Sequence, residues 1–197
     1  MSETDIKANK IDYKNFFYPP GGILIWILIM VELITFGAAL IALSINRREN
    51  PELYHQSRLM LNSTYGAINT IFLLTSGYFM ARTVYYVKQQ KLDKAAFNNK
   101  MAMIGGLLFL LLKSLEYYEK IEHGLTIGYN TFFTFYWLLT AFHVIHVLVG
   151  LGILFFMYLG LRKAKRPDIL NVEAGASFWH MCDLIWLLLF PMLYLIF

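Results

Sequence analysis

Ionisable side chains within long apolar segments are the residues of this chain best placed to do chemistry. A charged group at the centre of a bilayer costs about 2.5–3.5 kcal/mol, so such residues need partners and often mark a functional site. We take as candidates the ionisable residues in such segments and one tryptophan beside them: Glu32, Glu116, His143, His146, Trp179, His180 and Asp183. The chemistry open to them is proton transfer, lipid contact or ligation by histidine.

Glu32 lies deepest in its apolar segment. It is about ten residues into that segment, or about 15 Å along a helix, which is too far for its side chain to reach the membrane surface. Glu32 must therefore be protonated, or be paired inside the bundle or with another subunit. Two interpretations stay open, a proton-relay site and a buried, hydrogen-bonded structural acid.

The histidines are spaced so that they can share a helix face. His143 and His146 are three residues apart, as are His180 and Asp183, whose carboxylate can accept the imidazole N–H. The functional interpretation is ligation of a metal or haem, for example by His143 or His146 together with His180. The alternative is a hydrogen-bond network between membrane helices. The sequence contains no zinc motif, catalytic triad or phosphate-binding loop.

Two further polar patterns have structural interpretations. A narrow stripe recurs every seven residues, at Asn62, Asn69, Ser76 and Thr83, and predicts a helix-packing face beside small residues. A second group, Lys113, Glu116 and Lys120, has helical spacing and predicts an ion cluster at the outer interface, where the Lys113 side chain can extend to the headgroups.

Long apolar segments must position these side chains. A membrane-spanning helix needs about 20 apolar residues, and its backbone must be paired internally. Five segments qualify, over residues 22–45, 61–87, 101–118, 131–161 and 174–197. The 197 residues are 58% hydrophobic and 15% charged, against about 25% charged in soluble domains. We therefore expect an all-α membrane protein, with a polar tail over residues 1–20 and one five-helix transmembrane domain over residues 21–197.

Basic residues set the expected orientation. Eleven lysines and arginines fall in the tail and in the loops after the second and fourth segments, and four fall in the loops on the other side. The positive-inside rule then places the N-terminus in the cytoplasm and the C-terminus in the periplasm. The net charge of +4 suits lipid headgroups better than nucleic acid, and the loop Arg162–Arg166 is predicted to contact anionic lipid. The lone Cys182 excludes an intrachain disulfide.

Motifs from all five segments occur together in one order. They are Glu32 with Phe36; Asn69-Thr70-x-x-Leu73-Leu74-x-Ser76-Gly77; Glu116-Tyr117-Tyr118-Glu119; Phe142-His143-x-x-His146-Val147-x-x-Gly150; and Trp179-His180-x-x-Asp183-x-x-Trp186-Leu187. In this combination the chain resembles subunit III of the haem–copper respiratory oxidases, in its short five-helix bacterial form.

The resemblance implies an accessory subunit that holds no haem or copper of its own. Such a subunit packs mainly on oxidase subunit I, joins subunit II in the complex, and binds phospholipid in the bacterial inner membrane. It supports assembly and the uptake of protons by subunit I, which holds haem and copper and reduces oxygen. By position, Glu32 would be the lipid- and proton-side acid. His143, His146, His180 and Asp183 would form the polar interior.

Departures and alternatives remain at this point. Lys113 stands where the resemblance leads us to expect a glutamine, and the first two helices of the seven-helix form have no counterpart. The electron donor of the complex, cytochrome c or quinol, stays open. The alternatives are an accessory subunit of a nitric oxide reductase, a b-type membrane cytochrome with its own haem, and a small transporter, although five spans form no pair of repeated halves.

Overall fold

The computed structural model describes residues 19–163 and 168–196. Most of the predicted polar tail and part of the basic loop Arg162–Arg166 lie outside these residues. Six helices are present in the described part: α1 (Ile23–Glu49), α2 (Pro51–Leu59), α3 (Ser63–Lys88), α4 (Leu92–Glu122), α5 (Thr131–Lys163) and α6 (Ile169–Tyr194).

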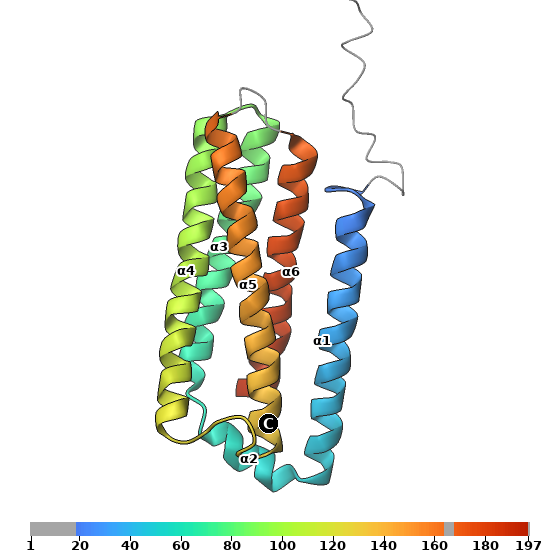
Figure 1. Ribbon diagram of the computed structural model, residues 1–197, viewed down its shortest axis with the longest axis vertical. Coiled ribbons are helices and arrows are strands. Elements are labelled where there is room, and N and C mark those ends of the chain that lie inside the picture. The colour runs from blue at the N-terminus through green and yellow to red at the C-terminus, as the bar shows by residue number, and fades with distance from the viewer. Residues whose placement is uncertain (1–18, 164–167, 197) are drawn as a thin grey trace, which may run out of the picture.

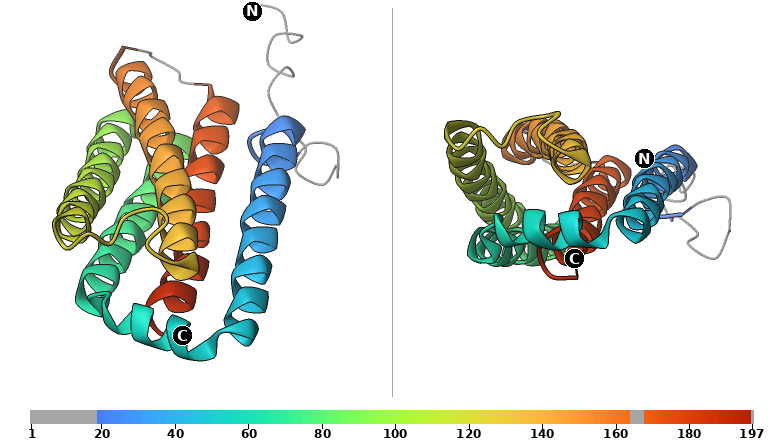
Figure 2. Two further views of the ribbon diagram at one scale, coloured as in Figure 1. Left: turned by 60° about the horizontal axis from the view of Figure 1, so that its bottom comes forward. Right: turned by 90° about the horizontal axis from the view of Figure 1, so that it is seen from below.

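Five of these helices run along the long axis of the molecule (Figure 1). Helices α3, α4, α5 and α6 form a bundle, and α1 stands at its edge, where it contacts α5 and α6. The short α2 lies across one end of the bundle (Figure 2). The start of α1 and the end of α6 lie at opposite ends of the molecule (Figure 1).

The prediction of an all-α membrane bundle is confirmed. Among the described residues, α1, α4, α5 and α6 are long and apolar enough to cross a membrane. Helix α3 has 26 residues and runs beside α4 and α6, but it is not among those four because its segment is less apolar. The chain is an integral membrane protein.

Helix ends differ from the predicted ones where polar residues continue a helix. The third predicted segment begins at residue 101, yet α4 begins at Leu92, because its first turns bury Ala95 and Ala96 against Val87 of α3 and Leu161 of α5. The short helix α2 was not predicted from the sequence. That helix begins at Pro51, whose missing N–H suits the first helical position.

The polar stripe of α3 is a packing face, as predicted for three of its four members. Asn69, Ser76 and Thr83 are fully buried, and the Ser76 hydroxyl donates to the Ala102 carbonyl of α4 at 2.6 Å. The fourth member, Asn62, instead caps α3 by accepting from the Thr64 N–H at 3.0 Å.

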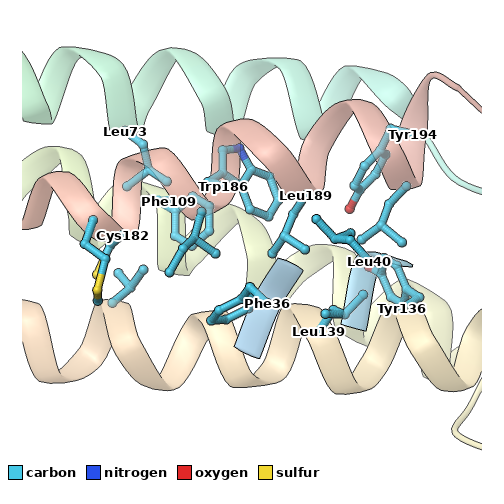
Figure 3. Packing of buried hydrophobic residues seen from close by; sticks show 14 of the residues in the cluster. Phe36, Leu40, Leu73, Phe109, Tyr136, Leu139, Cys182, Trp186, Leu189 and Tyr194 are labelled. Atoms are coloured by element: carbon cyan, nitrogen blue, oxygen red, sulfur yellow. The ribbon is translucent and has the colours of Figure 1, made fainter. Parts of the chain in front are cut away.

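Aromatic side chains fill the space between the helices. Trp186 of α6 lies edge to face with Phe109 of α4, with ring centroids 4.9 Å apart (Figure 3). Trp179 packs where α4 and α5 carry Gly106 and Gly150, at which an added Cβ would come within 3 Å of its ring. Its indole N–H donates to Ser76 Oγ at 3.0 Å. Trp179, a candidate site residue in the sequence, and Trp186 therefore both pack in the interior of the bundle.

Candidate functional site

Glu32 is paired across a helix interface. Its Oε2 lies 3.2 Å from Nε2 of His146 on α5, although the two groups lack the alignment of a hydrogen bond. Phe36, one turn along α1, covers the pair by stacking on Phe142 and meeting the His146 ring edge-on. Glu32 lies about 14 Å from the start of α1, so the pair sits within the apolar depth of the bundle. Of the alternatives left open for Glu32, the structure shows a neighbour inside the bundle.

The Glu32–His146 pair places a carboxylate oxygen beside an imidazole nitrogen. His146 Nδ1 lies 2.8 Å from the Phe142 carbonyl, which can only accept, so Nδ1 carries a hydrogen. In the neutral imidazole, Nε2 would then present a lone pair to the carboxylate oxygen, and the two acceptors would repel each other. A proton on either Glu32 or His146 Nε2 removes this repulsion. The pair can therefore store one proton at bilayer depth.

A second cluster joins α4, α5 and α6 near the end of the bundle at which α6 finishes. Lys113 Nζ lies 3.0 Å from Glu116 Oε2 and donates to the hydroxyls of Tyr136 (3.1 Å) and Tyr194 (2.8 Å). Both tyrosines donate in turn to Glu116 Oε1, at 2.9 and 2.6 Å. Both charged side chains are almost completely buried. Each oxygen of the carboxylate thus has a donor, and each donor comes from the protein.

Lys113 does not extend to the headgroups, and this part of the sequence prediction is wrong. Its ammonium lies within 5.5 Å of the ring centroids of Tyr117, Tyr136, Trp186 and Tyr194. Aromatic faces attract a cation. The charge of Lys113 is therefore balanced by Glu116 inside the bundle. Lys120, predicted in the same cluster, instead donates to the Met60 carbonyl at 2.7 Å.

His143 occupies the apolar interior of the bundle. Its side chain is fully buried, it stacks on Trp186 with ring centroids 5.4 Å apart, and it meets Phe109 edge-on. Neither ring nitrogen has a hydrogen-bond partner among the described residues. Although His143 and His146 are three residues apart, they face different neighbours, since His146 turns to α1.

His180 and Asp183 form the expected pair on α6. His180 Nδ1 lies 3.3 Å from Asp183 Oδ2, and Gly77 of α3 lies against both groups. A Cβ at Gly77 would lie 2.3 Å from that carboxylate oxygen, so only glycine lets α3 approach there. Asp183 is buried, but the His180 side chain is 44% exposed. His180 therefore does not belong to the polar interior that the resemblance implied.

The histidines do not converge on one point. His146 faces Glu32, His143 faces Trp186, and His180 faces outward. Within residues 19–163 and 168–196, no three His, Cys, Asp or Glu side chains gather closely enough to hold a metal ion. The arrangement favours proton storage and helix packing.

Comparison with known proteins decides the family. The sequence model of "Cytochrome c oxidase subunit III" matches residues 62–196. The chain is 31% identical over 176 residues to the cytochrome bo(3) ubiquinol oxidase subunit 3 of Buchnera aphidicola, covering 87% of this chain and 84% of that protein. The chain belongs to the cytochrome c oxidase subunit III family.

Other relatives are named as subunits of a cytochrome c oxidase or of a quinol oxidase. The chain is 28% identical over 138 residues to the cytochrome c oxidase subunit 3 of Corynebacterium diphtheriae, covering 69% of this chain and 67% of that protein. It is 23% identical over 176 residues to the probable quinol oxidase subunit 3 of Staphylococcus haemolyticus, covering 87% and 86%. Membership of the family implies an oxidase complex with other subunits.

The family match includes some of these clusters and leaves out Glu32. It covers α3 to α6, and so includes the Lys113–Glu116 cluster, both interior histidines and the His180–Asp183 pair. Glu32, on α1, lies before the matched residues. The sequence motifs indicated Glu32, Glu116 and the histidines, but not the partners Tyr136 and Tyr194, which lie 20 and 78 residues from Glu116.

Proposed function

We propose that this chain is the cofactor-free accessory subunit III of a haem–copper terminal oxidase. The complex would reduce oxygen in aerobic respiration and pump protons, with haem and copper held by the partner subunits. The observation that carries the proposal is the family match over residues 62–196, and the Glu32–His146 pair supports it, because a carboxylate and an imidazole 3.2 Å apart could share a proton without a metal. The main contact would be subunit I, with subunit II in the same complex.

The pair suits a role in proton uptake. Glu32 and His146 lie on different helices with Oε2 3.2 Å from Nε2, so a small rotation of either side chain would let a proton pass between the carboxylate and the imidazole. Phe36 and Phe142 shield the pair with apolar surface. A proton held there would be available to subunit I on the cytoplasmic side, if α1 begins at that surface as the charge distribution predicts.

Bound phospholipid is the second part of the proposal. An apolar groove of about 450 Å³ lies between α1 and α6, lined by Leu40, Ile41, Ser44, Ile45, Arg48, Leu188 and Met192. Its walls suit an acyl chain, and the guanidinium of Arg48 lies near the end of α1, where it can meet a phosphate. The groove is the support for lipid binding in the chain itself.

The proposed topology has five crossings of the bacterial inner membrane. Helix α3 would be the fifth span, because its 26 residues extend about 39 Å and it runs beside the helices that qualify by hydropathy. An odd number of crossings agrees with the opposite ends at which α1 starts and α6 finishes (Figure 1). Residues 21–197 would form a single membrane domain, with the N-terminus in the cytoplasm.

Co-purification tests the proposal. We expect a tagged chain, extracted in mild detergent, to bring down subunits I and II with the absorbance of their haems. A Soret band that stays with this chain after its separation would favour the b-type cytochrome instead. Recovery with the catalytic subunit of a nitric oxide reductase would contradict the assignment to an oxygen-reducing complex.

A further inference from the structure

The exposed side of α6 carries a polar residue where a membrane helix facing lipid would be apolar. His180, Leu184 and Leu188 follow one another at four-residue spacing and are all exposed. We call these three residues the His180 stripe. It lies on the helix that packs against α3, α5 and α1. His180 is its only member able to form hydrogen bonds through its side chain.

His180 lies too deep in its helix for the lipid headgroups to form a hydrogen bond with it. It lies about 17 Å from the start of α6 and about 21 Å from its end. An imidazole cannot extend over that distance, and acyl chains offer it no hydrogen bond. Ionisable residues within spans almost always face protein or a water-filled cavity. Lipid is therefore an unfavourable neighbour for His180, and a protein partner is the neighbour that can both exclude lipid and supply a hydrogen bond.

Asp183 prepares His180 for an outside partner. The carboxylate accepts from Nδ1, which leaves Nε2 of a neutral ring as an outward acceptor with no partner among the described residues. Asp183 itself is 7% exposed, and its Oδ1 has no hydrogen-bond partner in the described part of the chain. Because this oxygen is enclosed, the exposed Nε2 of His180 is the atom that a partner from outside can reach.

We propose that the His180 stripe is the docking site for a membrane-spanning helix of another oxidase subunit, which donates a hydrogen bond to His180 Nε2. Leu184 would pack against the apolar residues of that helix, and Leu188, which also lines the groove between α1 and α6, would lie where the helix meets the bound lipid. The inference rests on the proposed function, because it assumes an oxidase complex, and it adds which face of the subunit meets its partner. A lipid in the same place would leave Nε2 unpaired.

A photo-cross-linking amino acid at Leu184, introduced in the intact complex, tests the proposal. The matched control is Leu107 on α4, with 50% exposure against 46% for Leu184. The two are at similar depth, because Gly105 packs on Ser76 and the adjacent Gly77 packs on Asp183. We expect Leu184 to cross-link to a transmembrane peptide of another subunit. Cross-linking of Leu184 to lipid alone would overturn the proposal.

A second measurement separates docking from folding. We expect His180→Leu to speed the loss of this subunit from the complex, in rising detergent, by about three- to tenfold, the effect of one hydrogen bond between membrane helices. His180→Asn keeps an acceptor and should restore most of the retention. Equal retention of His180→Leu and the unchanged chain would count against the donor. If the unchanged chain brings down no oxidase subunit, the proposed function fails; if it does, but Leu184 meets only lipid, this inference alone fails.

Discussion

Removing the carboxylate of Glu116 should leave Lys113 as a buried charge without its counter-ion. In Glu116→Leu the ammonium keeps only the hydroxyls of Tyr136 and Tyr194, and both hydroxyls lose their acceptor. Breaking a buried ion pair on one side costs about 3–5 kcal/mol. For a chain of this size, about 2–4 °C are lost per kcal/mol, so we expect the unfolding midpoint to fall by about 6–20 °C.

Cys182 provides the assay, because it is the only cysteine of the chain and is fully buried on α6. The complex is heated with a maleimide that shifts the gel mobility of this subunit, so that labelling reports the opening of α6. Glu122→Leu, at an exposed position on the same helix, is the control and should leave the midpoint almost unchanged.

The double variant Lys113→Met/Glu116→Leu sharpens the test. Replacing both charges with apolar groups of similar size removes the unpaired ion, so most of the lost stability should return. The reasoning would be refuted by a Glu116→Leu midpoint equal to that of Glu122→Leu. A double variant less stable than Glu116→Leu alone would refute it as well.

Three further variants test other contacts. Glu32→Gln should still assemble, because the amide keeps a hydrogen-bonding group, and the ratio of this subunit to haem in the purified complex measures assembly; complete loss of assembly would contradict this, because it would show that assembly needs the acid itself. Gly77→Ala should lower the unfolding midpoint, because its Cβ meets the Asp183 carboxylate and overpacking costs about 1–3 kcal/mol; Gly152→Ala, which meets no atom within 4 Å, should not. Asn62→Ala should cost about 1 kcal/mol through the lost cap of α3, seen as a lower midpoint in the maleimide assay; an unchanged midpoint would show that the cap adds nothing.

The long apolar helices could be predicted from the sequence because membrane spans follow from length and hydropathy. The residues at which α4 and α6 begin could not be predicted from hydropathy. Their first turns carry polar residues, which pack on neighbouring helices or cap the helix. At α6 the cap is Asp168, which accepts from the Leu170 N–H at 3.0 Å. The short α2 is not apolar enough to be found by hydropathy. It is held by Ser57, whose hydroxyl accepts from the Asn130 side chain at 2.8 Å.

The candidate site was predictable where partners lie on one helix. The three-residue spacings of Lys113 with Glu116 and of His180 with Asp183 both correspond to contacts. Pairings between helices were not predictable, because the sequence does not tell which faces meet; the contact of Glu32 with His146 is the clearest case.

The direct test of the account is to separate this subunit from the purified oxidase and to measure haem and copper in both fractions. The account holds that the polar groups at bilayer depth are enclosed by protein, within this chain or in the complex, and carry no redox centre. It predicts that all haem and copper stay with the remaining subunits and that the separated chain is colourless. Stoichiometric iron or copper bound to the separated chain would contradict it.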